Sequence, residues 1–294
     1  QDIIQRYLEA MQAAGVEVVE LGFRTLKRQG FQGPCAYTTD EFLSSLTIPA
    51  SLIVGVMVNG SELVGEEPQQ KVLESLFPNI AGNSPVDLVR IACHVHEFEK
   101  ALRAATWLKG GGYQVGFNLM QVADLREEEV KMLARLANDY PLDALYFADS
   151  MGSMNPNQTA RIIQWLRSEW TGPIGIHTHD NLGLALSNTL RALDEGVTWV
   201  DSTITGMGRG PGNARTEELA IEIAERRGNP VNMVPLMALL REHFKPMQTQ
   251  CGWGSNPYYY LAGKHGIHPS YIQEMLGDSR YSEEDVLAVI EHLR

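Results

Sequence analysis

The sequence is poor in features that mark several large classes of protein. It has three cysteines among 294 residues, Cys35, Cys93 and Cys251, and none stands in a C-x-x-C pair. This argues against a disulfide framework or a cysteine zinc site and suits a reducing, cytoplasmic setting. The longest apolar run, residues 52–58, is too short to cross a bilayer, so no membrane partner is expected.

Basic residues are also scarce. Lys and Arg number 24 against 36 Asp and Glu, which gives a formal net charge of −12. A nucleic-acid partner is therefore not expected, because phosphate binding needs a basic surface. No G-x-G-x-x-G segment follows an early strand to open a helix, which disfavours an open doubly wound sheet relative to a closed barrel.

The sequence does contain a regular alternation of short β-branched segments and helical segments. Seven segments predict strands, and those from the third onward are each followed by a segment with helical periodicity. The predicted strands are 16–22, 51–58, 86–93, 113–122, 144–148, 173–179 and 199–205. Such alternation is typical of parallel strands joined by crossover helices.

The fold predicted from this alternation is α/β, a TIM (β/α)8 barrel with seven of its eight strands visible. A barrel of this type needs eight strands and about 250 residues. The chain opens at Gln1 in a predicted helix, so we expect the first barrel strand to precede Gln1. The barrel domain is predicted over 1–228 and a helical extension over 229–294. Within the extension, helices are expected at 233–244, 269–276 and 282–293, and a loop at 251–260.

Two histidines mark the candidate site. His177 and His179 stand one residue apart on a predicted strand, so both side chains project from one face and can hold a divalent metal. They end that strand, where barrel enzymes carry their chemistry. A glycine-rich segment, Gly206 to Gly212, brings Asn213 near them one strand–helix unit later. A hydrogen-bonded structural histidine is the alternative for either ring.

These residues lie in two stretches, 177–188 and 206–218, that together resemble motifs of the DRE-TIM metallolyase superfamily. That group includes 4-hydroxy-2-oxovalerate aldolase, hydroxymethylglutaryl-CoA lyase and 2-isopropylmalate synthase, and the resemblance runs from about residue 2 to 228. It implies that His177 and His179 are metal ligands and that Asn213 is a ligand or a neighbour of one. It also implies an Arg-Asp motif on the first strand, which we expect upstream of Gln1. Mixed imidazole, carboxylate, amide and water ligands favour Mn²⁺ or Mg²⁺.

Local matches favour the oxovalerate aldolases within this superfamily. The segment 89–94 is similar to their V-R-V-A-T-H, and 146–150 to their Y-M-A-D-S. The loop 206–212 lacks the catalytic cysteine of hydroxymethylglutaryl-CoA lyases, and it differs from the G-E-R-A-G-N of the isopropylmalate-type synthases. Asp180 departs from the aldolases, which usually have histidine there.

The resemblance therefore implies a metal-dependent aldolase or lyase that makes or breaks a C–C bond next to a 2-oxo acid. Its partners would be a 2-oxo acid such as pyruvate and an aldehyde, together with a homodimer or a partner dehydrogenase. Two alternatives stay open: an acyl-CoA-dependent Claisen synthase, and a truncated barrel without catalytic activity.

Five further residues complete the predicted site. Tyr258 is chosen as the catalytic tyrosine that the resemblance places in the tail, although Tyr259 and Tyr260 compete with it. Glu20 is predicted to fix the arginine of the upstream motif, with a polar residue of the barrel interior as the alternative. Three residues are predicted to bind substrate, and a capping histidine, a turn serine and a solvated arginine are their alternatives: His94, Ser150 and Arg209.

Overall fold

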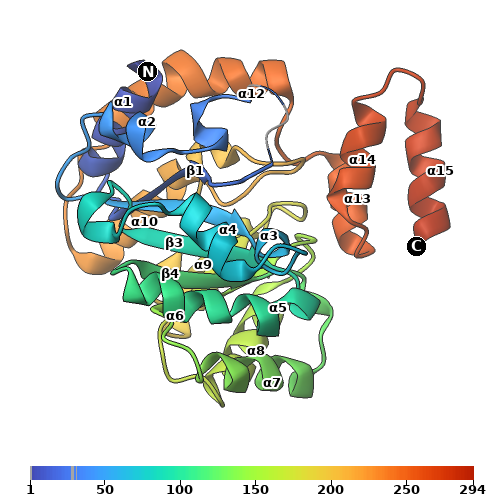
Figure 1. Ribbon diagram of the computed structural model, residues 1–294. Helices are drawn as coiled ribbons and strands as arrows, with labels where there is room; N and C mark the ends of the chain where they lie inside the picture. Colours follow the sequence, from blue (N-terminus) through green and yellow to red (C-terminus); the bar gives the residue numbers. More distant parts are fainter. Residues whose placement is uncertain (1, 28–29, 31) are drawn as a thin grey trace.

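A single parallel β-sheet organises the computed structural model, which describes residues 2–27, 30 and 32–294 (Figure 1). Each strand pairs with the next one in the chain, in parallel, from β1 to β7. The strands are β1 (Val18–Phe23), β2 (Ile53–Asn59), β3 (Leu88–Cys93), β4 (Gln114–Leu119), β5 (Ala144–Asp149), β6 (Ile174–Thr178) and β7 (Trp199–Val200). The predicted parallel α/β architecture with seven strands is confirmed.

The last strand ends earlier than the sequence predicted. Residues Ile204–Gly206 form a 3₁₀ turn, and Thr205 has a positive φ of 54°. The backbone N–H of Thr205 donates to the Glu217 carboxylate over 3.0 Å, which holds the turn against the following helix. The chain therefore bends away from the sheet where an extended segment to Thr205 was expected.

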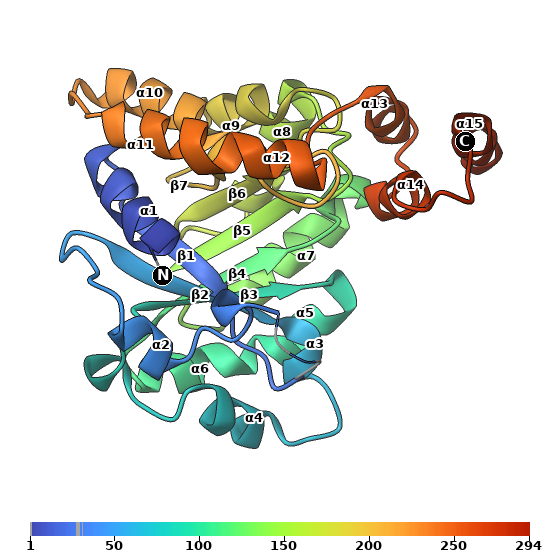
Figure 2. The ribbon, with the colours of Figure 1, turned by 90° about the horizontal axis from the view of Figure 1, so that it is seen from above.

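The sheet curls into an open barrel. Within the described residues β1 and β7 form its two edges and do not pair with each other. Along this open side runs a cavity of about 1180 Å³, lined by both edge strands and by the helices on either side of them. Figure 2 shows α1 (Asp2–Ala13) beside this opening.

Helices cover the outer face of the sheet, as the crossover pattern predicts. One predicted helix, 95–108, is two helices that meet at Leu102. Asn155 caps the helix that follows β5 by accepting from the backbone N–H groups of Asn157 and Gln158. The helices up to residue 228 are α1, α2 (Asp40–Ser44), α3 (Gly60–Leu63), α4 (Gln69–Leu76), α5 (Val95–Ala101), α6 (Arg103–Gly110), α7 (Glu127–Ala137), α8 (Pro156–Arg167), α9 (Ala185–Asp194) and α10 (Thr216–Arg227).

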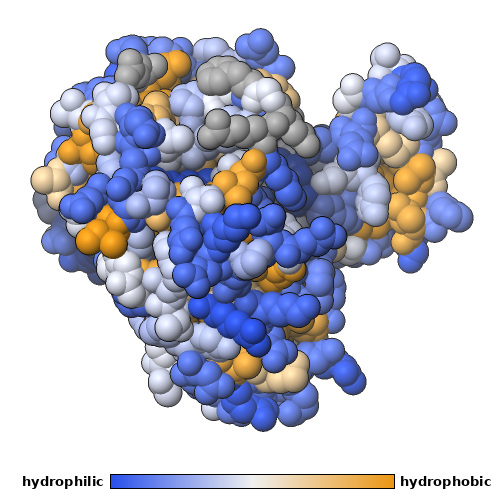
Figure 3. Space-filling view, viewed as in Figure 1, coloured by the Kyte–Doolittle hydropathy of each residue, from blue (hydrophilic) through white to orange (hydrophobic). Residues whose placement is uncertain are grey.

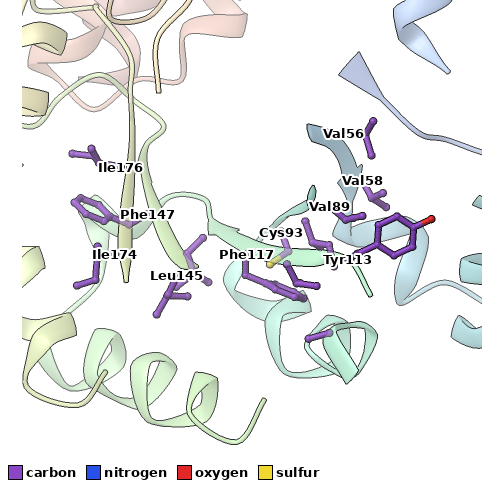
Figure 4. Close-up of a cluster of buried hydrophobic side chains, with 14 of the residues drawn as sticks. Val56, Val58, Val89, Cys93, Tyr113, Phe117, Leu145, Phe147, Ile174 and Ile176 are labelled. Carbon is purple, nitrogen blue, oxygen red and sulfur yellow. The ribbon is translucent and has the colours of Figure 1, made fainter. Parts of the chain in front are cut away.

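Alternate strand residues divide the sheet into two environments. The outward set packs under the helices as a continuous apolar core, in which Phe117 and Phe147 are fully buried (Figure 4). The inward set is polar near the middle of the sheet. Arg90 of β3 and Tyr146 of β5 project there, since they alternate with buried apolar neighbours.

Glycines on neighbouring strands make room for these large inward side chains. Arg90 lies in register with Gly116 and Tyr146 with Gly175. A Cβ atom at Gly116 would stand 3.0 Å from Arg90 Cγ, and one at Gly175 would stand 2.3 Å from Tyr146 Cδ1. The barrel interior thus accommodates an arginine and a tyrosine because the strand beside each carries hydrogen in place of a side chain.

The segment after residue 228 has two parts. The first is α11 (Val234–Leu239), a π-helical turn at Leu240–Phe244, and α12 (Lys245–Cys251). Helix α11 packs on α1, and Leu236, Leu239 and Phe244 belong to the main core. The division between the two hydrophobic cores falls after α12, and the domain boundary at 228 stays a prediction.

The second part is a three-helix lobe: α13 (Pro257–Lys264), α14 (Pro269–Leu276) and α15 (Glu283–Leu293). It has its own small core, which includes Tyr259, Ile272 and Val286. In Figures 1 and 3 the lobe stands out from the side of the barrel. Helix α13 replaces part of the predicted loop 251–260, because Asn256 accepts from the N–H of Tyr259 and caps it. None of the described helices is long and apolar enough to cross a membrane.

Candidate metal centre

The barrel interior contains a chain of buried ion pairs that leads to His177. Arg90 donates to Glu20 over 2.6 and 3.1 Å, and it also donates to Asp201. Its guanidinium carbon lies 4.7 Å above the ring of Tyr146. Glu20 is thus engaged by Arg90 of this chain, which corresponds to the interior polar role that the sequence analysis gave as its alternative.

His177 is oriented by Asp201. The Nδ1 atom of His177 lies 3.0 Å from Oδ2 of Asp201. Burial would raise the pKa of Asp201, but the charge of Arg90 and the hydrogen bond to His177 outweigh it and lower that pKa to about 2. The carboxylate therefore stays ionised and accepts, so Nδ1 of His177 donates to it and Nε2 is the nitrogen left for another partner.

His179 is oriented by a backbone carbonyl. Its Nδ1 lies 2.8 Å from the oxygen of Asp149, so this nitrogen donates and Nε2 is again the free acceptor. Burial, with help from the charges of His177, Arg209 and His268, lowers the pKa of His179 to about 3. The ring is neutral at physiological pH, the state that a metal ligand requires.

Asn213 brings a third donor to the two rings. It forms an isolated antiparallel bridge with His179, and the N–H of Asp180 donates to the carbonyl of Gly212 over 2.9 Å. The Nδ2 atom of Asn213 lies 3.2 Å from the carbonyl of Met207. Its Oδ1 atom is buried and has no hydrogen-bond partner. Such an oxygen is costly unless a ligand satisfies it.

These donors fit a divalent metal. The rings of His177 and His179 have centroids 5.0 Å apart and both present Nε2, while Asn213 offers an amide oxygen. Among the residues that the structure describes, no group of three or more His, Cys, Asp and Glu side chains is placed to hold a metal. Two imidazoles and one amide leave the other positions of an octahedral shell to further oxygen ligands.

A second cluster of polar groups lies beside this centre at the carboxyl ends of the strands. Arg209 of the glycine-rich loop bonds to Nε2 of His268 over 3.1 Å and to Oγ of Ser270 over 2.9 Å. His94, at the end of β3, is near enough to His268 to lower its pKa, after the larger effects of burial and Arg209. Two predicted substrate-binding residues, His94 and Arg209, thus lie in one region, together with α14.

Ser150 contacts the turn after β4. Its hydroxyl oxygen accepts from the backbone N–H of Gln121 over 2.9 Å, and the residue is 7% exposed. Gln121 has a left-handed backbone, with φ of 60°. The hydroxyl therefore holds the turn after β4, as expected of a turn serine, and its role in substrate binding stays a prediction.

The three adjacent tyrosines, residues 258–260, have different surroundings in the structure. Tyr258 points to α15, where a hydrogen bond to Glu283 raises its pKa. Tyr259 is 3% exposed and approaches the glycine-rich loop, since a Cβ atom on Gly210 would lie 3.5 Å from its hydroxyl oxygen. Tyr260 is 48% exposed. The cap at Asn256 sets the helical phase and turns Tyr259, and not Tyr258, toward the glycine-rich loop, while the catalytic role given to Tyr258 stays a prediction.

The sequence analysis missed three residues of the interior. Arg90 and Asp201 form the ion pairs described above, and Asn118 of β4 has a buried Oδ1 atom without a partner. Each is a polar residue inside or beside an apolar strand, which is itself a signal, since buried charges need partners. Their convergence, however, depends on the curl of the sheet.

Comparisons with known proteins agree with this geometry. A model of the HMGL-like family matches residues 80–241, more than half of the chain. Oxaloacetate decarboxylase of Mycobacterium tuberculosis is 26% identical over 292 residues, which are 98% of this chain and 83% of the decarboxylase. The 4-hydroxy-2-oxovalerate aldolase of Pelotomaculum thermopropionicum is 32% identical over 214 residues, which are 71% of this chain and 60% of the aldolase. The match thus spans less than two thirds of that aldolase.

Solved structures show the same fold. The N-terminal domain of a candidate aldolase from Bacteroides vulgatus superposes with a TM-score of 0.85 and 28% identity, over 98% of this chain and 93% of that one. An HMG-CoA lyase of Bacillus subtilis has a TM-score of 0.66 at 18% identity over 86% and 87%, which is a likeness of fold alone. The chain belongs to the HMGL-like family, one of metal-dependent lyases within the DRE-TIM metallolyase superfamily.

Proposed function

We propose that this protein is a divalent-metal-dependent aldolase or lyase that acts on a C–C bond next to a 2-oxo acid. The observation that carries the proposal is the free, buried Oδ1 atom of Asn213 beside two histidines whose Nδ1 atoms are already engaged. His177, His179 and Asn213 would hold Mn²⁺ or Mg²⁺. When bound, the ion supplies a Lewis acid for the keto and carboxylate oxygens of the substrate.

The chain's own groups then have distinct tasks. Asp201 keeps His177 in the ligating tautomer, and Arg90 keeps Asp201 ionised. The Asn118 amide faces the same interior and offers an unpartnered oxygen to a substrate hydroxyl. His94 and Arg209 lie at the outer end, where the part of the substrate remote from the 2-oxo acid would extend.

Tyr259 is our candidate for proton transfer. In aldol cleavage the hydroxyl proton passes to water, the C–C bond breaks, its electron pair forms the enolate and an aldehyde departs. A proton from the Tyr259 phenol to the enolate carbon then gives the 2-oxo acid, and the phenolate regains a proton from water. Burial raises the pKa of Tyr259, against a smaller effect of Arg209, so the phenol stays protonated at neutral pH. A protonated phenol suits the donor in that last step.

Decarboxylation is a second candidate reaction at the same centre. The decarboxylase from Mycobacterium tuberculosis matches nearly the whole chain and most of its own length. Loss of CO₂ from a 2-oxo diacid leaves the same type of enolate as aldol cleavage, so the same donors serve both reactions. Aldehyde release from 4-hydroxy-2-oxopentanoate and CO₂ release from oxaloacetate separate the two, and release of free CoA would favour the Claisen alternative.

The direct test is enolisation of pyruvate. The protein is incubated with pyruvate in D₂O, with Mn²⁺, Mg²⁺ or excess chelator, and loss of the methyl proton signal is followed by NMR. Exchange that needs the metal and is abolished in His179→Ala supports the proposal. If no divalent metal promotes exchange, the proposed function is wrong. Asp194→Asn, a change at an exposed pair with Arg226, is the matched control.

A further inference from the structure

Arg209 is a half-buried cation that lacks an anionic partner. Its contacts in the described part of the chain are neutral: Nε2 of His268 at 3.1 Å and the hydroxyl of Ser270 at 2.9 Å. His268 faces two donors, Arg209 at Nε2 and the backbone N–H of Ser270 at Nδ1 over 3.4 Å, and burial and the charge of Arg209 lower its pKa, so it offers Arg209 no negative charge. Burial lowers the pKa of Arg209, and no carboxylate is among the groups that act on it.

The more deeply buried arginines Arg24 and Arg90 are paired with carboxylates, Arg24 with Asp40 and Arg90 with Glu20 and Asp201. Arg167, which is half-buried like Arg209, donates to the carbonyl oxygens of Gly172 and Gly196. A cation removed from water without a counter-ion is unfavourable. Arg209 therefore differs from Arg24 and Arg90 in having an unmet electrostatic requirement, which an anion from outside the chain would satisfy.

The loop that carries Arg209 is held firmly. The N–H of Gly254 donates to the carbonyl of Gly210 over 2.9 Å, and Gly210 packs beside the ring of Tyr259. The same loop continues to Asn213. Ser270 lies in the first turn of α14 and His268 is the cap residue before it, so the barrel loop and the C-terminal lobe build the arrangement together.

The position of this cluster relative to the metal donors suggests its task. Arg209 is close enough to His179 for its charge to lower the pKa of that ring, and the same loop runs on to Asn213. His94 approaches His268 from the end of β3. A molecule seated on His177, His179 and Asn213 that extends out of the barrel would meet Arg209 at its far end.

We propose that Arg209, His268 and Ser270 form a subsite for an oxyanion group, a carboxylate or a phosphate, at the distal end of the aldehyde partner. This inference rests on the proposed function, which makes a 2-oxo acid the substrate at the metal centre. A guanidinium presents paired N–H donors to such a group, and the Ser270 hydroxyl adds another. The preferred aldehyde is therefore anionic, unlike a short neutral alkyl aldehyde.

The kinetic test compares aldehydes that differ in charge. Condensation of pyruvate is measured with succinic semialdehyde against butanal, and with glyceraldehyde 3-phosphate against glyceraldehyde. We expect at least one of the two anionic aldehydes to have a higher kcat/KM than its neutral counterpart. The aldehyde that does so shows whether the subsite favours a carboxylate or a phosphate. Arg209→Gln should lower that preference, as a ratio of kcat/KM values, by about tenfold to hundredfold, the range for a charge-assisted hydrogen bond. Arg280→Gln, on the same lobe and paired with Asp278, should leave the ratio unchanged.

A binding test separates this inference from the proposed function. Inorganic phosphate and succinate are titrated calorimetrically into the wild type, Arg209→Gln and Arg280→Gln. Binding of one anion that only the Arg209 change weakens, by about tenfold or more, supports the subsite even if pyruvate shows no exchange. If pyruvate exchanges but neither anion binding nor the aldehyde ratio depends on Arg209, the subsite is wrong and the proposed function stands. If Arg209→Gln does not fold, Ser270→Ala replaces it in both measurements, the calorimetric titration of the anions and the ratio of kcat/KM values for charged and neutral aldehydes.

Discussion

The carboxylate of Asp201 accepts a hydrogen bond from Nδ1 of His177 over 3.0 Å. Asp201 comes directly after β7, and His177 lies near the end of β6, so the bond crosses between adjacent strands at the inner face of the barrel. Arg90 of β3 donates to the same Oδ2 atom from the far side of the interior. One carboxylate thus links the orientation of a metal ligand to a buried ion pair.

Asp201→Asn should weaken metal binding although it removes no metal donor. The amide of asparagine is neutral, so it does not favour a proton on Nδ1 of His177 as the carboxylate does. Its NH₂ group can also donate a hydrogen bond to Nδ1, which favours the other tautomer of the ring. We expect the affinity for Mn²⁺ to fall about 10- to 100-fold, as for other groups that orient metal-bound histidines. Titration followed by electron paramagnetic resonance measures it. An affinity within twofold of the wild type would contradict this role for Asp201, and Asp194→Asn provides the control for an exposed aspartate.

Gly208→Ala should also weaken metal binding, through Asn213. A Cβ atom at Gly208 would lie 2.6 Å from Nδ2 of Asn213, too close for the amide to stay in place. Displacing Oδ1 from the two histidines should reduce Mn²⁺ affinity by about tenfold or more. The matched control is Gly110→Ala, whose Cβ atom would meet nothing within 4 Å. Equal affinities for the two variants would contradict the placement of Asn213.

The sequence predicted the fold well because the signals for it are local. Alternation of residues along 173–179 places His177 and His179 on one face, and the spacing of strands and helices predicts parallel pairing. The interior ion pairs were not predicted, because Arg90 and Asp201 are 111 positions apart and meet only when the sheet curls. Arg90 did carry a local signal, as a charge between the apolar segments 88–89 and 91–93.

The C-terminal lobe shows a second limit on what can be predicted from the sequence. Three adjacent tyrosines have the same chemistry, so composition does not distinguish them. The helix cap at Asn256 does: it begins α13 and fixes which way each of the following side chains points. With residues 251–260 predicted as a loop, there was no helical phase by which to distinguish Tyr258, Tyr259 and Tyr260.

Tyr259→Phe should impair catalysis far more than Tyr258→Phe. Loss of the phenol proton at Tyr259 is expected to slow turnover of a 4-hydroxy-2-oxo acid by about 10²- to 10⁴-fold, the usual contribution of a general acid or base. Tyr258 lies against Glu283 of α15, so its variant should keep turnover within a few-fold of the wild type. Metal affinity, measured in parallel, should be the same in both variants. A larger loss in Tyr258→Phe would return the assignment to Tyr258.

The last prediction concerns stability away from the site. Arg24 donates to Asp40 and to the carbonyls of Thr38 and Leu76, and is 3% exposed. Burial alone would raise the pKa of Asp40, but hydrogen bonds from Asn79, Arg24 and Ser84 outweigh it and lower the pKa. Asp40→Asn leaves Arg24 buried without its anion, which should cost about 3–5 kcal/mol of unfolding free energy at pH 7.

The pH dependence of this cost follows from the sign of the shift. Because folding lowers the pKa of Asp40, its contribution is fully present above the unfolded-state pKa of about 3.9 and is lost as pH falls through the folded-state value. Urea unfolding at pH 7 and at pH 3 should therefore show a smaller difference between wild type and Asp40→Asn at the lower pH. Asp278→Asn, at a surface pair with Arg280, should change the free energy of unfolding far less than Asp40→Asn at pH 7. A penalty for Asp40→Asn that does not shrink on acidification would show that the carboxylate's charge is not what stabilises Arg24.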